Sequence, residues 1–463
     1  MPSACPSGSS AGLVPSVLRR PRPRGGFRRG SVLRGLAAAL LTGGLLAGSV
    51  LTGAAPAAAE TVYITADRML DVRSGGMVAR PAVLVEDGRV AKVGTVTDLP
   101  APQGATRIDL PGLTLLPGLI DMHVHLTSRH DLHGYRRLTR NATDLAIDGV
   151  VNARTTLEAG FTTVRNLGAG SFADVAVKRA VEEGRVPGPR LIVSGPPLSA
   201  LGGHGDANLM PYDLQREAEG VATGPWALAE KVRYNRKFGA DVIKIMATGG
   251  VLSKGTEVGA QQLTEEEMAA IVKEAHMLGM KVAAHAHGNA GIKAAIRAGV
   301  DTVEHASFLD AEAIALAKKN GTVLAMDIYN TEFILGEGEK AGILPESLAK
   351  ERTVGQTQRT SFGEAVKAGV KLTFGSDAGV YPHGWNAKQF SRMVKFGMTP
   401  LQAIQAATVV AADALGMAEE VGSIAPGRYA DMVAVAADPL ADIATLETIP
   451  VVIKGGEVVK DVR

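Results

Sequence analysis

The sequence is poor in cysteine, in aromatic residues and in net charge. Its 463 residues include one cysteine, Cys5, and only 4% are Phe, Trp or Tyr. Lysine and arginine number 49 against 47 aspartate and glutamate, a formal net charge of +2. A lone cysteine excludes an intramolecular disulfide, and this charge is too small for a typical nucleic-acid-binding protein. With 46% hydrophobic residues, the composition indicates a globular protein with no nucleic-acid partner.

The first 59 residues differ in composition from the rest. They hold seven arginines, no lysine, no acidic residue and the only cysteine. An apolar run from Gly35 to Gly53 follows the arginines, and Ala57-Ala58-Ala59 has the small-residue pattern of a cleavage site. We therefore expect residues 1–59 to be a secretory signal peptide, which would make the protein secreted or periplasmic. A retained membrane anchor is the alternative reading, and Arg28-Arg29 would suit the twin-arginine export route.

Without this leader, the remaining 404 residues carry a net charge of −5 and no cysteine. A mildly acidic chain has no electrostatic attraction to an anionic membrane, so we expect no membrane partner after leader removal. The sequence does not determine whether the protein forms a homo-oligomer.

The order of apolar runs predicts an α/β fold. Between residues 117 and 424, eight short apolar runs alternate with stretches of helical periodicity, which is typical of a (β/α)8 TIM-like barrel. Residues 60–116 and 425–463 contain short β-branched runs and turn residues instead, and we expect these two ends to form one small flanking β-sandwich domain. The predicted barrel strands are 118–122, 161–164, 191–193, 242–245, 282–285, 302–305, 323–326 and 372–375.

Two of the expected helices have clear start signals. Thr264 can cap a helix that runs to Leu278, with Glu267 completing a capping box. Thr399-Pro400 is a typical opening for a helix from Leu401 to Met417.

Polar residues interrupt or end several of the apolar strands. His123 and His125 follow the first strand at a spacing that directs both imidazoles to one face, although such a pair alone is more often structural. The ends of barrel strands converge at one mouth, and burying polar residues there is costly unless they bind a partner. We therefore expect a metal site at that mouth. Its six residues are His123, His125, Lys244, His285, His305 and Asp377.

The chain resembles the amidohydrolase superfamily, and three further motifs carry the resemblance together with these six residues. They are residues 117–125 (PGLIDMHVH), 375–379 (GSDAG) and 422–431 (GSIAPGRYAD). The match runs from Thr61 to the C-terminal region. Members of this superfamily share the barrel fold that the apolar runs predict.

The resemblance implies two divalent metal ions, in most members zinc. His123, His125 and Asp377 would hold one ion, His285 and His305 the other, and Lys244 would bridge both as a carbamate. A hydroxide between the two ions would be the nucleophile, and Asp377 would take its proton and deliver it to the leaving amine. Lys244 and Asp377 are thus the expected catalytic residues. These ligand types suit Zn, Co or Mn alike.

Longer stretches are similar to the branch that contains Xaa-Pro dipeptidases and ochratoxin-hydrolysing amidases. They are residues 201–206, 237–244, 247–253, 285–288 and 381–384. The resemblance implies a small-molecule substrate, a dipeptide or an N-acyl amino acid, in which an amide is joined to an amino acid with a free carboxylate. Such a substrate needs polar contacts beside the metals, and each candidate also has a structural alternative. The candidates are His204, His287, Tyr234 and His383.

Two other functions stay open at this stage. The same barrel could hydrolyse lactones, cyclic amides or esters, or the chain could be a non-catalytic binding homologue. An acyl-enzyme route has little support, because neither a G-x-S-x-G motif nor a cysteine occurs after residue 59.

Overall fold

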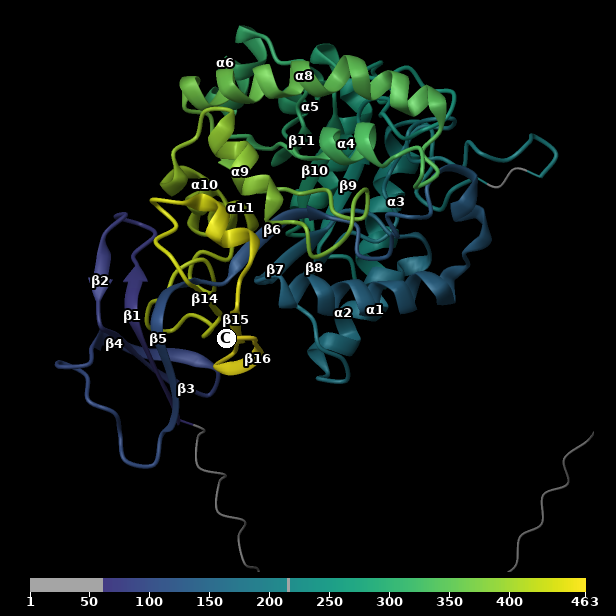
Figure 1. Cartoon of the computed structure of the whole chain (residues 1–463). Helices are drawn as coiled ribbons and strands as arrows, with labels where there is room; N and C mark the ends of the chain where they lie inside the picture. The colour runs from purple at the N-terminus through teal and green to yellow at the C-terminus, as the bar shows by residue number, and fades with distance from the viewer. Residues whose placement is uncertain (1–60, 215–216) are drawn as a thin grey trace, which may run out of the picture. The chain divides into compact units, whose positions relative to one another are not determined.

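The computed structural model describes residues 61–214 and 217–463 (Figure 1). The predicted signal peptide, residues 1–59, lies outside the described residues. Within the two described ranges, the structure contains no helix that is both long and apolar enough to cross a membrane.

Eight parallel strands form the barrel predicted from the apolar runs. Hydrogen bonds join them in sheets of three and five strands. Asp241 N donates to Val193 O (2.8 Å) and Leu198 N to Lys244 O (2.8 Å), which joins β8 and its C-terminal extension to β9. Met122 N donates to the carbonyl of Phe374, just after β13 (2.9 Å), which closes the ring. The strands in order are β6 (Leu119–Val124), β7 (Phe161–Asn166), β8 (Arg190–Val193), β9 (Val242–Met246), β10 (Lys281–Ala286), β11 (Thr302–His305), β12 (Val323–Ala325) and β13 (Leu372–Thr373).

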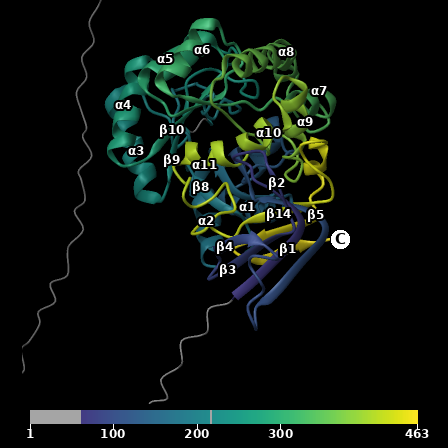
Figure 2. The ribbon, with the colours of Figure 1, turned by 90° about the vertical axis from the view of Figure 1, so that its left-hand side faces the viewer.

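Helices follow the barrel strands along the chain and cover them on the outside. Figure 2 shows helices α3 to α8 as an arc around the strands. The predicted capping box is present at the start of α4, where Thr264 and Glu267 exchange hydrogen bonds with each other's backbone. The helices are α1 (Ala142–Glu158), α2 (Ala173–Glu182), α3 (Pro225–Phe238), α4 (Glu265–Met277), α5 (Asn289–Ala298), α6 (Ala311–Asn320), α7 (Asn330–Gly336), α8 (Pro345–Ala368), α9 (Lys388–Lys395), α10 (Pro400–Ala406) and α11 (Val409–Leu415). The described part of the chain also contains the short 3-10 helices η1 (Gly134–Thr139), η2 (Gly170–Phe172) and η3 (Ile443–Glu447).

The single helix predicted from Leu401 to Met417 is two helices, α10 and α11, in the structure. The break has a tertiary cause. The carbonyls of Ala406 and Ala407 accept hydrogen bonds from Phe374 N (2.9 Å) and Ile120 N (2.8 Å), so they leave the helical hydrogen-bond pattern to bind the barrel. Local sequence carries no signal for this exchange.

Strands from both ends of the described chain form the flanking domain. The central strand β5 pairs in parallel with β1 and antiparallel with β14, so it joins the N-terminal and C-terminal segments. Val90 N donates to Arg428 O and Gly427 N to Val90 O (both 2.8 Å), which brings edge strand β4 back to the segment before β14. The sheet therefore curls around an apolar core. Its strands are β1 (Thr61–Leu70), β2 (Met77–Ala79), β3 (Pro81–Glu86), β4 (Arg89–Thr95), β5 (Thr106–Pro117), β14 (Met432–Val435), β15 (Val451–Lys454) and β16 (Glu457–Asp461).

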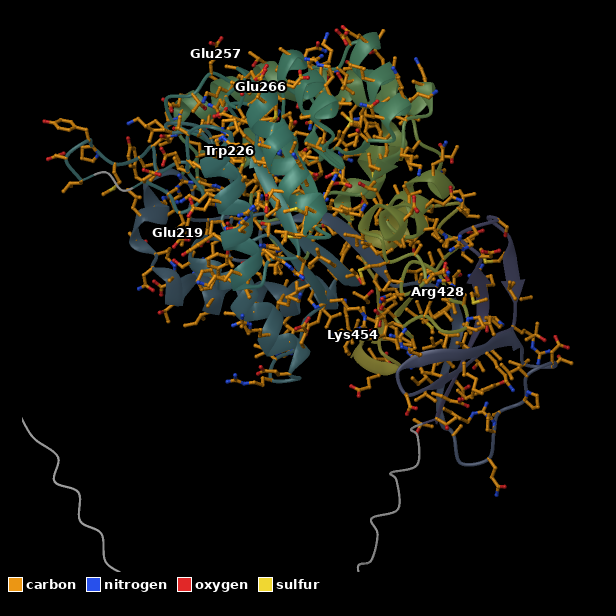
Figure 3. The ribbon with its side chains drawn as sticks, turned by 180° about the vertical axis from the view of Figure 1, so that it is seen from behind. Glu219, Trp226, Glu257, Glu266, Arg428 and Lys454 are labelled. Atoms are coloured by element: carbon orange, nitrogen blue, oxygen red, sulfur yellow. The ribbon has the colours of Figure 1, made fainter. Side chains whose placement is uncertain are left out.

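Polar contacts join this domain to the barrel. Lys454 of β15, labelled in Figure 3, donates from Nζ to Gly188 O (2.7 Å), just before β8. Arg190 of β8 forms a two-pronged ion pair with Asp431 (2.9 and 3.2 Å). The domain boundaries at residues 117 and 424 stay a prediction.

Candidate metal and substrate site

A cavity of about 600 Å³ lies at the carboxyl ends of the barrel strands. All six residues predicted as metal ligands line it, although they come from five different strands or strand ends. This convergence follows from the barrel, because its parallel strands all end at the same mouth. The cavity also receives His204 and His287.

The first group of candidate ligands consists of His123, His125 and Asp377. His123 Nε2 and His125 Nε2 lie 3.3 Å apart. Asp377 Oδ1 is 3.0 Å from His125 Nε2 and 3.4 Å from His123 Nε2. Three donor atoms at this spacing, two from imidazoles and one from a carboxylate, suit a divalent transition metal.

The second group consists of His285, His287 and His305, whose ring nitrogens lie within 4.8 Å of one another. The ring centroids of His285 and His305 are 4.6 Å apart, and those of His287 and His305 are 4.8 Å apart. His287, predicted as a substrate contact, thus lies among the candidate ligands themselves.

Several buried nitrogen atoms of cavity-lining side chains have no hydrogen-bond partner among the described residues. They include Lys244 Nζ, His285 Nε2 and His204 Nδ1. Leaving such atoms unpaired is costly, so their presence in the cavity wall fits a site built for a bound ion. Burial lowers the pKa of Lys244 to about 8, against the opposing charges of Glu304 and Asp377. A lysine with this pKa has a sizeable neutral fraction near pH 8, and carbamate formation requires the neutral amine.

The backbone is strained at two of the candidate ligands. His305 has φ of 68° and Asp377 has φ of 59°, values that non-glycine residues rarely adopt. Strain of this kind persists only where the surrounding structure holds it, and it is concentrated at functional sites. Both turns direct a polar side chain into the cavity.

Two further side chains fix His305 and Asp377. Asp327 Oδ1 accepts a hydrogen bond from His305 Nδ1 (2.7 Å), which leaves Nε2 of that ring for a ligand. Asn330 Nδ2 donates to Asp377 Oδ2 (2.9 Å). Sequence reasoning missed both residues, although Asp327 follows the apolar run 323–326 just as Asp377 follows strand eight.

A buried ion pair lies beneath His123. Arg165 of β7 donates to Glu304 Oε1 of β11 (2.8 Å) and to Met122 O of β6 (2.6 Å). The other carboxylate oxygen, Glu304 Oε2, is 3.2 Å from His123 Nδ1. The pair thus supports the histidine from inside the barrel. The sequence signal was weak, because both residues look like single charges within short apolar strands.

His204 and His287 lie where substrate could reach them. The His204 ring stacks on the His285 ring, with centroids 4.2 Å apart. Burial, together with the charges of His305, Lys244 and Arg137, lowers the pKa of His204 to about 3, so this ring is neutral. His287 Nδ1 is 2.7 Å from Ser307 Oγ, which fixes the orientation of its ring.

The structure does not bring the other two predicted substrate contacts to the cavity. His383 is buried behind His125: its Nε2 donates to His125 O (3.2 Å) and its Nδ1 accepts from Thr156 Oγ1 (3.2 Å). Both ring nitrogens therefore have structural partners. Tyr234 lies on the outer helix α3, 43% exposed, where its ring packs against Phe238. A helix that covers the outside of the barrel cannot present this side chain to the mouth.

Comparisons with known proteins identify the family of this chain and relatives with the same fold. The model of the amidohydrolase family matches residues 114–459. Ochratoxinase of Aspergillus niger is 34% identical over 416 residues, which cover 83% of this chain and 84% of that protein. A crystal structure of a Xaa-Pro dipeptidase with methionine bound in its active site superposes with a TM-score of 0.83 at 36% identity, covering 86% of this chain and all of the other. The crystal structure of A. niger ochratoxinase superposes with a TM-score of 0.78 at 30% identity, over 87% and 96% of the two chains.

Proposed function

This chain belongs to the amidohydrolase family and is a hydrolase of amide bonds, and we propose that it is an exported, binuclear metal-dependent enzyme that releases a C-terminal amino acid. Its substrates would be dipeptides or N-acyl amino acids. One observation carries the proposal: buried nitrogen atoms without a hydrogen-bond partner among the described residues, Lys244 Nζ and His285 Nε2 among them, share one cavity with the candidate metal ligands. The relatives named as ochratoxinase and Xaa-Pro dipeptidase support the substrate class.

The donor set fits two divalent ions, with zinc the first candidate. His123, His125 and Asp377 would hold one, His285 and His305 the other, and carbamylated Lys244 would contact both. When bound, such ions supply an activated water and polarise the scissile carbonyl. His287, the third member of the second group, would act as a further ligand or as a substrate contact.

The protein's own groups would position the substrate and move the proton. Asp377 accepts a hydrogen bond from Asn330 at Oδ2, which holds its carboxylate in the cavity wall. We assign to Asp377 the proton transfer to the leaving amine. His204 and His287 would bind the substrate's polar atoms, and the enclosing walls would exclude bulk water from them.

The first test is a substrate panel on metal-replete protein. Xaa-Pro, Xaa-Arg and Xaa-Phe dipeptides and N-acyl amino acids are compared with lactones and hydantoins. We expect turnover of at least one amide that has a free carboxylate. Turnover of lactones or hydantoins alone would contradict the proposed substrate class.

The second test is metal analysis of the wild type and Lys244→Ala. We expect about two equivalents of metal in the wild type and fewer in the variant, because the bridging ligand is lost. Lys350→Ala is the matched control. Lys350 Nζ donates a hydrogen bond to Ser253 O (2.7 Å), and Lys350 is not one of the candidate metal ligands. A wild type that never holds more than about one equivalent, with Lys244→Ala unchanged, would contradict a binuclear site.

Export is the third part of the proposal. It rests on the arginine-rich and apolar segments within residues 1–59. N-terminal sequencing of the protein recovered outside the cytoplasm should begin at Glu60. A start at residue 2 would contradict a cleaved leader.

A further inference from the structure

We propose that Arg137 binds the free carboxylate of the amino acid that the enzyme releases. Arg137 lies on η1, in the loop between β6 and α1, and lines the cavity. The inference rests on the proposed function, because it names the group that recognises one end of that substrate. Arg137 is not among the substrate contacts expected from the sequence.

Among the described residues, Arg137 differs from the other arginines of the cavity in having no anionic partner. Arg129 forms a two-pronged ion pair with Asp131 (3.0 and 2.7 Å). Arg140 pairs with Asp148 (2.8 Å). The guanidinium of Arg137, by contrast, has no hydrogen bond or ion pair within residues 61–214 and 217–463. Its positive charge is therefore available to a ligand.

The surroundings of Arg137 enclose the guanidinium without covering it. The Arg137 side chain is exposed to solvent. Nevertheless, the protein atoms packed around its guanidinium lower the pKa of Arg137 through burial. This combination is expected of a side chain in a cavity wall, which is open to a ligand on one side only. A carboxylate that bound there would meet the charge in a partly desolvated setting, where ionic hydrogen bonds are stronger.

The helical turn that carries Arg137 is anchored to the α7–α8 connection. The neighbouring Arg136 donates from its guanidinium to Lys340 O (2.8 Å), and His133 N donates to Ala341 O (3.1 Å). Gly134 approaches this connection so closely that an added Cβ would lie 2.6 Å from Gly342 O. Arg137 is thus presented by a fixed element, which lowers the entropic cost of binding a ligand.

Arg137 lines the same cavity as the candidate metal ligands and as His204, whose ring stacks on that of His285. A substrate bound beside the candidate ligands would therefore share this cavity with the guanidinium.

Arginine suits this task chemically. Its planar fork forms two parallel hydrogen bonds with a carboxylate, and charge-assisted bonds of this kind change affinity by roughly 10- to 100-fold. A carboxamide presents one oxygen acceptor and no charge. The enzyme should therefore prefer an acid to its amide.

The test compares binding of amino acids with binding of their carboxamides. L-proline, L-arginine and L-phenylalanine, each beside its amide, are titrated by calorimetry into metal-replete wild type, Arg137→Gln, Arg137→Lys and Arg129→Gln. We expect the wild type to bind at least one acid about 10-fold or more tightly than its amide. Arg137→Gln should remove this preference, and Arg137→Lys should keep part of it, because lysine retains the charge without the fork. Arg129→Gln is the matched control and should keep the full preference, since Arg129 is already neutralised by Asp131.

Three results would overturn the inference: no preference for acids in the wild type, an unchanged preference in Arg137→Gln, or an equal loss of acid and amide binding in that variant. The last would indicate a structural role. Failure of the proposed function is distinguishable from these. A protein that prefers acids through Arg137 but hydrolyses no free-carboxylate amide would contradict the function and support the inference.

Discussion

At the residue scale, Glu304 and Arg165 form an ion pair inside the barrel, and each side chain is at most 2% exposed. Removing one partner of a buried pair leaves an uncompensated charge. We expect Glu304→Gln to lower the free energy of unfolding by about 3–5 kcal/mol. Urea denaturation of chelator-treated protein measures the change. Glu158→Gln, which breaks an exposed pair with Arg154, should lower the free energy of unfolding far less, because solvent screens exposed ion pairs. Equal effects of the two substitutions would contradict this account.

Glu351 carries a pH-dependent contribution to stability. Burial raises the pKa of this cavity-lining carboxyl from 4.5 to about 7, although a hydrogen bond from Thr331 opposes the shift. Between about pH 4.5 and 7, the folded state therefore holds a proton that the unfolded state has released. Stability from this group is present below pH 4.5 and is lost as the pH rises to about 7.

The corresponding variant is Glu351→Gln, which resembles the protonated side chain at every pH. We expect its melting temperature to exceed that of the wild type at about pH 8, with the difference shrinking toward about pH 5. Thermal unfolding of chelator-treated proteins across this range measures it. Glu346→Gln, an exposed change on the same helix, is the control. A difference that grows toward acid pH would reverse the sign and contradict the assignment.

At the element scale, the loops after β8 and β9 meet at Gly250. A Cβ on Gly250 would lie 2.3 Å from Cε1 of His204, so any side chain there must displace that ring from its stack on His285. We expect Gly250→Ala to reduce kcat/KM by about 10- to 100-fold, because small displacements of positioning groups have effects of this size. Gly170→Ala is the matched control, since Gly170 lines the same cavity and its Cβ would meet no atom within 4 Å. Steady-state kinetics that show equal losses would contradict the role given to His204.

At the scale of the whole molecule, stability should depend on metal and not on sulfur. Residues 60–463 contain no cysteine, so a reducing agent should leave the melting temperature unchanged. A ligand that binds only the folded state stabilises it, and removing tightly held ions with a strong chelator should lower the melting temperature by about 5 °C. Differential scanning calorimetry compares the two treatments. A shift with reductant and none with chelator would contradict both expectations.

Much of the fold and part of the candidate site could be predicted from sequence, because the signals are local. Apolar runs alternating with helical periodicity identified all eight barrel strands, since burial on a strand depends on short-range pattern. The spacing of His123 and His125 placed both imidazoles on one face, and strand ends indicated Lys244, His285, His305 and Asp377 as their neighbours. These residues do line one cavity.

Contacts between distant segments were decided by the tertiary structure alone. The break between α10 and α11 depends on hydrogen bonds from β6 and the end of β13, and the support of His123 depends on a charge pair from β7 and β11. Tyr234 and His383 lie in segments next to barrel strands in the sequence. In the structure, Tyr234 is on the outside of the barrel, and His383 is hydrogen-bonded behind His125. Arg137 has polar and charged neighbours in sequence, and its lack of a partner emerges only when the chain is folded. Periodicity determined which segments are strands because it is written in adjacent residues. Which charges are paired and which are left open to a substrate is set by residues far apart in the chain, and so by the fold.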